Sequence, residues 1–492
     1  MLRDVHRKRS VRERIQALER DARRLDPDAA QRTALRDAAS AYTEQFLERL
    51  GELPAYRPGF DNPVGALVQP FAEEPADIEQ VLAILGSEVD APGINPASPG
   101  AFGYIPGGGL YPAALGDFLA DVTNRYAGVF YAAPGAVRLE MQLVGWLAGL
   151  VGYPAGTAGG DLTSGGSIAN LSGIVAAREA HGVRAADLTR RVVYLSEQSH
   201  HSVGKALRLA GLEECVHRII EVDERWRMEA DALAARIEAD RRAGLLPWMV
   251  VATAGSTDVG AVDPLGTIAQ IAAAKGLWLH IDAAYGGAFL LCEPGRQTLA
   301  GIEQSDSTVI DPHKGLFLPY GSGALLMRDR EHLAVANRYH ANYMQDAQRP
   351  DVELSPADLS PELSRPFRGL RLWLPLKLFG LAPFRAALEE KLLLARHFHA
   401  CLSEQPHWAV GPTPDLSVVT YRYVPERGDV DEFNRRLAAA VQNDGRIYIS
   451  STQLHGRFTL RLAVLNFRTY LEQVELALEL LEHHALRLVE SA

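Results

Sequence analysis

The sequence has little of several features that mark other classes of protein. Its 492 residues contain three cysteines, Cys215, Cys292 and Cys401, too few and too scattered for a disulfide framework or a metal cluster. No apolar run has the length of a membrane span, and no signal peptide is recognisable. The net charge of −11 offers no basic excess to neutralise nucleic-acid phosphates. We therefore expect a cytoplasmic protein with neither a nucleic-acid nor a membrane partner.

Lysine is also scarce, although the chain has 50 basic residues. The six lysines are Lys8, Lys205, Lys275, Lys314, Lys377 and Lys391. Where positive charge alone is needed, the chain mostly uses arginine, which stays protonated and forms no Schiff base. A lysine in a motif such as DPHKG, at Lys314, is therefore mildly informative about chemistry.

The length of the chain predicts more than one domain. We expect an N-terminal helical segment over 1–94, a large α/β domain over 95–366 and a small α+β domain over 367–492. Strand and helix patterns alternate from about 160 to 330, which predicts a mostly parallel central sheet flanked by helices, with ligand groups at its carboxyl edge. The expected strands are 192–195, 248–253, 277–281, 308–310, 323–327, 418–423, 448–451 and 458–463. The run FRGLRLWLPLKLFG, from Phe367, is expected to begin a long helix.

Two of these strands end in residues that can carry chemistry. The apolar run Leu277–Ile281 leads to Asp282, and Thr308–Ile310 leads to Asp311, His313 and Lys314. A structural ion pair is one explanation for a carboxylate and a lysine at neighbouring strand ends. Pyridoxal phosphate is the other, because it needs a lysine for a Schiff base and a carboxylate to keep its pyridine nitrogen protonated.

A serine- and glycine-rich segment, TSGGS at 163–167, precedes an apolar helix that we expect from about Ile168. Glycines allow close approach to an anion, and the amides at a helix N-terminus favour phosphate. The hydroxyls of Ser164 and Ser167 could donate further hydrogen bonds. An ordinary helix cap has a similar sequence. The segment matches neither the Walker motif nor the GxGxxG dinucleotide motif.

Two further segments are candidates for the site. His200 and His201 follow a predicted strand; adjacent residues point apart and no third ligand is evident, so a metal site is not expected. Stacking of one imidazole on an aromatic cofactor suits these residues better than metal binding. The segment 95–112 is rich in glycine and aromatic residues and is either a flexible surface loop or part of the wall of a ligand site.

Together these motifs resemble the group II pyridoxal-phosphate decarboxylases, which include aromatic-amino-acid, histidine and glutamate decarboxylases. The resemblance covers about 60–480, and its motifs are TSGGSIAN, EQSHHSVGKA, HIDAAYGG and DPHKG. It implies the fold type I architecture of aspartate aminotransferase and a homodimer with active sites at the interface. It also implies an L-amino acid as substrate, with CO2 and an amine released through an external aldimine and a quinonoid carbanion.

The resemblance also implies a role for particular residues. Lys314 would hold pyridoxal phosphate, Asp282 would pair with its ring nitrogen and His200 would stack on its ring as the third catalytic residue. The remaining expected contacts are Gly166, Ser167 and Asp311 with the phosphate, Ala284, Thr257 and His313 with the rest of the cofactor, and Tyr104 and Ile105 with the substrate.

The sequence departs from the family pattern in two places. Members usually carry a tyrosine proton donor on a mobile loop, which we expect within 330–364, and its replacement by phenylalanine is associated with aldehyde formation. That region has Ser355, Pro356 and Leu359 here, so Tyr320, Tyr339 or Tyr343 would have to substitute. Gly315 stands where many aromatic-acid members have tryptophan, and Gly107–Gly109 would widen the substrate loop, which puts an ordinary aromatic substrate in doubt.

Three functions therefore remain open from the sequence. A decarboxylase is the first, and another reaction of the same cofactor, such as aldehyde synthesis or C–C cleavage, is the second. The third is a protein that binds the cofactor without catalysis, against which the intact set of Asp282, Lys314 and His200 speaks. The missing glycine motif argues against a nicotinamide-dependent dehydrogenase.

Overall fold

The computed structural model describes residues 2–59, 65–338 and 353–491. The chain forms two compact units, one of residues up to 53 together with 57–95, the other of residues 54–56 together with 96 onward. None of the helices that the structure describes is long and apolar enough to cross a membrane.

The first unit is helical, as its sequence predicts. It contains α1 (Leu2–Ala22), α2 (Ala29–Glu48) and α3 (Ile78–Ile84). The side chain of Asp28 accepts a hydrogen bond from the Gln31 amide, and the Gln31 side chain accepts one from the Asp28 amide, so α2 begins with a capping box. The Tyr42 hydroxyl donates to Asp90 at 2.5 Å, which ties α2 to the segment after α3.

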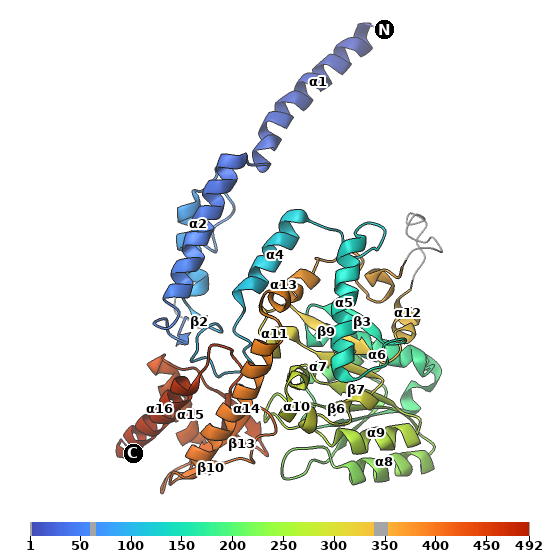
Figure 1. The fold of residues 1–492 in the computed structure, drawn as a ribbon, viewed down its shortest axis with the longest axis vertical. Helices are drawn as coiled ribbons and strands as arrows, with labels where there is room; N and C mark the ends of the chain where they lie inside the picture. The colour runs from blue at the N-terminus through green and yellow to red at the C-terminus, as the bar shows by residue number, and fades with distance from the viewer. Residues whose placement is uncertain (1, 60–64, 339–352, 492) are drawn as a thin grey trace. The chain divides into compact units, whose positions relative to one another are not determined.

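The second unit is built on a seven-stranded sheet (Figure 1). Its strands, in spatial order, are β3 (Gly159–Thr163), β9 (Gly323–Met327), β8 (Ser307–Ile310), β7 (Trp278–Asp282), β6 (Leu246–Thr253), β4 (Arg191–Ser196) and β5 (Val216–Ile220). Only β9 runs against its neighbours, so the expected mostly parallel sheet is confirmed. The sequence patterns missed β3 and β5, the two edge strands.

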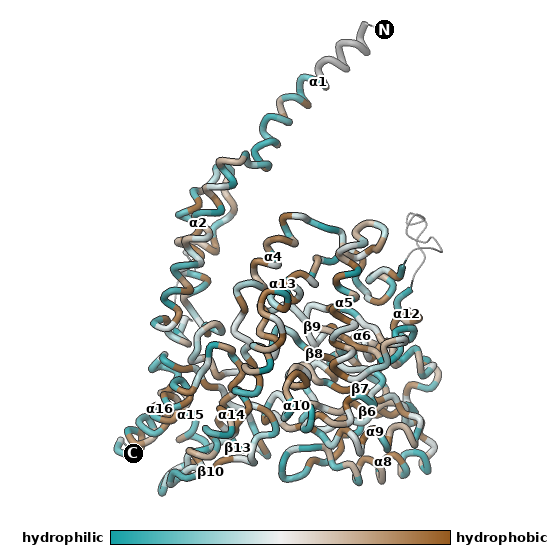
Figure 2. The backbone as a smooth tube through the Cα atoms, in the orientation of Figure 1, coloured by the Kyte–Doolittle hydropathy of each residue, from teal (hydrophilic) through white to brown (hydrophobic). Residues whose placement is uncertain are grey.

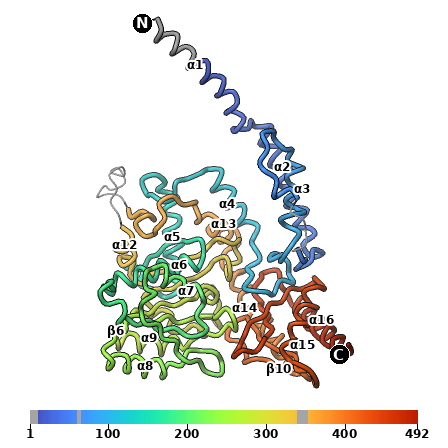
Figure 3. Tube along the Cα trace, turned by 180° about the vertical axis from the view of Figure 1, so that it is seen from behind, coloured from blue at the N-terminus to red at the C-terminus, as the bar shows by residue number. Residues whose placement is uncertain are grey.

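Helices cover both faces of this sheet, which Figures 1 and 3 show from opposite sides. Along β6, Val250 and Ala252 belong to one apolar cluster, while Met249 and Val251 belong to the other. Because successive side chains of a strand point to opposite faces, a strand covered on both sides reads as a continuous apolar run. The first cluster is shared with α5 (Pro134–Val151), α8 (Ala230–Arg242) and α9 (Leu265–Ala274), and the second with α6 (Gly166–Ala180), α7 (His201–Leu209) and α12 (Glu331–Asn337).

The C-terminal part of this unit contains a smaller antiparallel sheet, as predicted. Its order is β10 (Trp408–Val410), β11 (Val418–Tyr423), β13 (Arg457–Ala463) and β12 (Ser450–Leu454), and its helices are α14 (Ala382–Ser403), α15 (Val430–Asp444) and α16 (Leu471–Glu490). Two details differ from expectation. The strand expected at 448–451 begins at Ser450, and the long helix expected from Phe367 is broken after α13 (Gly369–Phe379), where Gly380 has a φ of +68°.

Candidate active site

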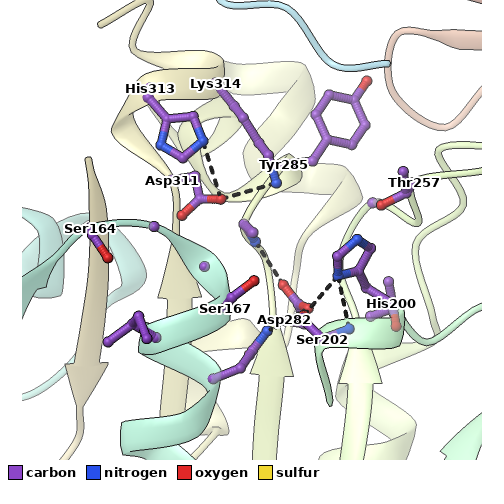
Figure 4. A pocket seen from close by; sticks show the side chains of 17 residues that line it. Ser164, Ser167, His200, Ser202, Thr257, Asp282, Tyr285, Asp311, His313 and Lys314 are labelled. Atoms are coloured by element: carbon purple, nitrogen blue, oxygen red, sulfur yellow. Dashed lines mark hydrogen bonds and ion pairs between the residues drawn. The ribbon is translucent and has the colours of Figure 1, made fainter. Parts of the chain in front are cut away.

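A cavity of about 280 Å³ lies at the carboxyl ends of β6, β7 and β8 and at the N-terminus of α6 (Figure 4). All nine residues that the sequence predicted around a cofactor line it. They are Gly166, Ser167, His200, Thr257, Asp282, Ala284, Asp311, His313 and Lys314. Parallel strands place their carboxyl ends along one edge, which brings together residues more than a hundred positions apart.

Asp282 ends β7 and is almost fully buried. Its Oδ1 accepts a hydrogen bond from the Ala284 amide at 3.1 Å, and its Oδ2 accepts one from Asn170 Nδ2 at 3.0 Å. Both carboxylate oxygens therefore receive an N–H donor. Sequence reasoning missed Asn170, although it lies within the TSGGSIAN motif.

Lys314 lies on α11 (Pro312–Gly315), directly after β8. Its Nζ is 3.0 Å from Asp311 Oδ2, and His313 Nε2 is 3.7 Å from the same oxygen, so both side chains point toward Asp311 (Figure 4). Burial lowers the pKa of His313, and its Nδ1 lies 2.5 Å from the backbone oxygen of Ser322. The second oxygen of Asp311 is buried and has no hydrogen-bond partner among the described residues.

The start of α6 forms a cradle that has room for a bound group but not for further side chains. A Cβ atom on Gly166 would lie 2.9 Å from Asp311 Oδ2 and 3.3 Å from the Cβ of Ala284, so only glycine fits. Gly165, with a φ of +154°, precedes the helix, and Ser164 and Ser167 also line the cavity. Backbone amides and two hydroxyls at the N-terminus of a 15-residue helix suit an anion such as a phosphate.

His200 precedes α7 as its N-cap residue. Its Nδ1 accepts a hydrogen bond from the Ser202 amide at 3.3 Å and lies 2.7 Å from the Ser202 hydroxyl. Burial lowers the pKa of the imidazole. A ring nitrogen that accepts a backbone N–H carries no proton, so His200 presents a neutral ring to the cavity.

The loop over 95–110 is not a flexible surface loop. Phe102 is fully buried, and a Cβ atom on Gly107 would lie 2.4 Å from the carbonyl oxygen of His313. A Cβ atom on Gly108 would lie 2.2 Å from Asn466 Oδ1. These glycines allow close packing, so the prediction that they widen the substrate loop is wrong for both.

The departure at Gly315 also has a packing reason. A Cβ atom there would lie 2.5 Å from the Cβ of Ala288, and Gly315 does not line the cavity. Its small size therefore adds no space for a substrate.

Tyr104 and Ile105 are not part of this cavity. Ile105 is buried, whereas the side chain of Tyr104 is 60% exposed and its backbone has a φ of +55°. Arg461 on β13 holds this residue in place: its Nη2 donates to the Tyr104 carbonyl at 3.1 Å and to the Thr257 carbonyl at 2.6 Å. Arg461, a residue that sequence reasoning missed, thus links the small sheet to the cavity wall.

The positions considered for the proton donor lie away from the cavity or outside the described residues. Ser355, Pro356 and Leu359 are buried and do not line the cavity. Tyr339 and Tyr343 lie outside the described residues, as does the middle of the predicted loop, residues 339–352. Tyr320 is largely exposed, with its ring 5.6 Å from that of His313.

A second set of buried polar side chains contacts β3, the strand that leads into the cradle. Arg365 Nη2 contacts Glu140 Oε2 at 3.1 Å and the Leu162 carbonyl at 2.8 Å, while its Nη1 contacts Asp161. Arg368 Nη1 donates to the same carbonyl at 3.2 Å, and its guanidinium also pairs with Glu362. Arg365, Glu140 and Asp161 are all nearly inaccessible to solvent. We call these five charged residues the Arg365 cluster; it holds β3, the strand that leads into the cradle.

The cavity fits pyridoxal phosphate. It combines an anion cradle, a lysine amine and a buried carboxylate that accepts two N–H groups, and a buried carboxylate oxygen of Asp311 has no partner among the described residues. Among the described residues, no group of three or more histidine, cysteine or acidic side chains is arranged to hold a metal ion.

Comparisons with known proteins point to the same chemistry. Residues 67–424 match the model of the pyridoxal-dependent decarboxylase conserved domain. The aromatic-L-amino-acid decarboxylase of Bacillus atrophaeus is 34% identical over 83% of this chain and 85% of its own length. The phenylacetaldehyde synthase of Arabidopsis thaliana is 29% identical over 80% of this chain and 83% of its own length. The solved structure of Oryza sativa TDC with PLP and tryptamine superimposes with a TM-score of 0.89 at 27% identity, covering 94% of this chain and 99% of that one.

Proposed function

The chain belongs to the pyridoxal-dependent decarboxylase family and is an amino-acid carboxy-lyase that uses pyridoxal phosphate, and from this premise we propose that its substrate is an aromatic L-amino acid. The main support for the proposed site is that Asp282, Lys314, His200 and the α6 cradle all line one cavity. The aromatic side chain of the substrate is supported by the names of the relatives. It is also supported by the packing of Gly107, Gly108 and Gly315, which create no extra space.

We assign the following roles to residues of the cavity. When bound, pyridoxal phosphate supplies an electron sink for the electron pair that remains at the substrate Cα as CO2 departs. Lys314 would hold the cofactor covalently through its amine. Asp282 would pair with the ring nitrogen, and the neutral ring of His200 would stack on the cofactor ring. The remaining cofactor contacts are assigned to Gly166, Ser167, Thr257, Ala284 and His313.

Asp311 is better suited to Lys314 than to the phosphate. Two anions repel each other, whereas Asp311 Oδ2 already lies 3.0 Å from Lys314 Nζ. We therefore assign Asp311 to hold the lysine as an ammonium group whenever it is not bonded to the cofactor. In that position the lysine stays close to the reacting carbon without drifting into solvent.

A homodimer is also a proposal, and the exposed face of α4 (Tyr111–Thr123) supports it. Leu115, Phe118, Leu119 and Val122 recur at helical spacing and are between 38% and 69% exposed. The tube of α4 is largely coloured as hydrophobic in Figure 2. Such a stripe on a folded protein marks an interface. The exposed Tyr104 would then contact the substrate in the site of a second subunit, whereas the buried Ile105 would support that loop from within its own subunit. Phe118→Glu should convert a dimer into a monomer in analytical ultracentrifugation. A wild-type chain that sediments as a monomer would remove this proposal.

A cytoplasmic location is proposed on composition alone, and cell fractionation tests it.

Aldehyde formation is the second candidate. It is favoured by the positions of Ser355, Pro356 and Leu359, none of which lines the cavity, and by the likeness to a phenylacetaldehyde synthase. In that reaction water hydrolyses the oxidised product to the aldehyde, oxygen is reduced to hydrogen peroxide, and ammonia leaves with the CO2. A simple decarboxylase consumes no oxygen.

One experiment separates these outcomes. Purified protein is mixed with a panel of L-amino acids while absorbance, CO2 release and oxygen uptake are recorded together. CO2 without oxygen uptake, strongest with an aromatic amino acid, supports the proposal; oxygen uptake in step with CO2 supports the aldehyde. Lys314→Ala should lose the visible band of the bound cofactor, while Lys205→Ala, which changes an exposed lysine on α7, should keep it.

A further inference from the structure

We propose that a buried hydrogen-bond chain from Trp278 through Ser307 and His280 to Asn170 positions Asp282 and His200 for the cofactor. This inference rests on the proposed roles of Asp282 and His200 in the site. The three inner members of the chain do not touch the cavity; only Asn170 lines it. They are positioning residues, because they act through Asn170.

The chain is continuous and buried. Trp278 Nε1 donates to Ser307 Oγ at 2.9 Å, and Ser307 Oγ lies 2.7 Å from His280 Nδ1. His280 Nε2 lies 2.8 Å from Asn170 Oδ1, and Asn170 Nδ2 donates to Asp282 Oδ2 at 3.0 Å. Ser307 and His280 are fully buried, and Asn170 is 1% exposed, so no water competes for these bonds.

The direction of every hydrogen bond follows from the chemistry of its two ends. An indole nitrogen can only donate, and an ionised carboxylate can only accept. Ser307 therefore accepts from Trp278 and donates its own proton to His280 Nδ1. The proton of the imidazole then sits on Nε2 and is donated to Asn170 Oδ1. The amide group of Asn170 is left to face Asp282 with its NH2.

The other tautomer of His280 is unfavourable. If His280 carried its proton on Nδ1, the bare Nε2 would face Asn170 and the amide would rotate by half a turn. Its oxygen would then face the carboxylate of Asp282, so that two acceptors would repel each other in a buried site. Burial lowers the pKa of His280 to about 4, which keeps the ring neutral and prevents both nitrogens from carrying protons at neutral pH.

The second proton of the Asn170 amide extends the chain to His200. Asn170 Nδ2 also donates to Ser202 Oγ at 3.1 Å, and the Ser202 hydroxyl lies 2.7 Å from His200 Nδ1. A hydroxyl that accepts from Asn170 is free to donate to His200. One amide orientation thus supports the anionic form of Asp282 and the neutral form of His200 together.

Ser307→Ala tests the chain at a position remote from the cavity. It removes the hydroxyl that specifies the tautomer of His280, and the expected result is about a tenfold rise in the dissociation constant for pyridoxal phosphate. The visible band of the bound cofactor should also shift, while KM for the amino acid changes little and kcat falls. Asn170→Leu should raise the dissociation constant more, about a hundredfold.

Ser305→Ala is the matched control. Ser305 is another fully buried serine close in the chain, hydrogen-bonded to Tyr153 and Thr308 but not to the chain that ends at Asp282. It should destabilise the fold in a similar way without a change in cofactor affinity or spectrum. Equal effects of Ser305→Ala and Ser307→Ala on the dissociation constant would overturn the inference.

A double variant separates a positioning role from a general structural one. In an Asp282→Ala background, Ser307→Ala should cause much less further loss of cofactor affinity, because its main target has been removed. Undiminished loss in that background would overturn the inference. If wild-type protein binds no pyridoxal phosphate at all, the proposed function itself fails; if it binds and turns over while Ser307→Ala and Asn170→Leu behave as wild type, only this inference fails.

Discussion

The hydrogen-bond chain to Asp282 and the Arg365 cluster are both buried, yet they consist of different kinds of group. The chain is a row of neutral donors and acceptors with one charge at its end. The Arg365 cluster contains two guanidinium groups and three carboxylates within a short distance. Neutral groups cost little to bury and can fix an orientation, whereas buried charges hold segments together and are costly to separate. We expect damage to the first to appear in catalysis and damage to the second in stability.

The largest effect is expected from Asp282→Ala at the charged end of the chain. Turnover should fall by more than about a thousandfold, because the cofactor ring loses the anion that makes it an electron sink. The unfolding midpoint should change much less, since Asp282 lines the cavity and does not pack in the apolar core. The measurement is kcat with saturating cofactor, together with thermal unfolding. Retention of full turnover would show that the assigned role of Asp282 is wrong.

Arg365→Ala should have the opposite effect, with the main loss in stability and not in turnover. Glu140 and Asp161 would be left buried without their common cation, and the free energy of unfolding should fall by about 4 kcal/mol. Urea denaturation measures this loss. The control is Arg138→Ala, which breaks an exposed pair with Glu353 and should change stability little. If the two arginine variants unfold at the same urea concentration, the Arg365 cluster does not stabilise the fold.

The chain also predicts sensitivity to acid. Burial lowers the pKa of His280 to about 4, from 6.5 in the unfolded chain, so the unfolded state binds more protons between these values. The stabilising contribution is complete above pH 6.5 and is lost as the pH falls toward 4, by roughly 3 kcal/mol in all. His280→Gln has no titrating group at this position, so its stability should depend less on pH over that interval. An unchanged slope in this variant would contradict the assignment.

The Arg365 cluster predicts an effect of the opposite sign. Burial raises the pKa of Glu140 to about 7 and also raises that of Asp161. Because the folded state then holds the extra proton, stability should decline as the pH rises from about 4.5 to 7. Glu140→Gln has no titrating carboxyl group at this position and should flatten this decline. Denaturation at pH 5 and pH 8 gives the comparison.

The sequence predicted best those features that depend on local pattern. The apolar runs before Asp282 and Lys314 are fully buried strands, so their composition alone identified them and the chemistry at their ends. The edge strand β5 was missed because His217 and Arg218 interrupt its apolar pattern, and β3 because it begins with two glycines. Gly380, which separates α13 from α14, was included in one predicted helix.

The residues missed in the site share a different property. Asn170, His280 and Arg461 act through partners that are far away in the sequence, such as Asp282 for Asn170 and Thr257 for Arg461. No local period or spacing indicates such a contact. The same holds for Gly107, whose neighbour is the carbonyl group of His313.

The contacts of Arg461 bear on how the enzyme is made. This one side chain donates to Ser450, to the carbonyl groups of Asp258 and Thr257, and to that of Tyr104, more than 350 residues earlier in the chain. Contacts of such sequence separation form late, since the intervening chain must first be ordered. Until β13 has left the ribosome, Thr257 in the wall of the cofactor pocket therefore lacks its hydrogen bond from Arg461. We expect pyridoxal phosphate to be captured only after synthesis passes this strand, so that nascent chains stalled before it remain without cofactor.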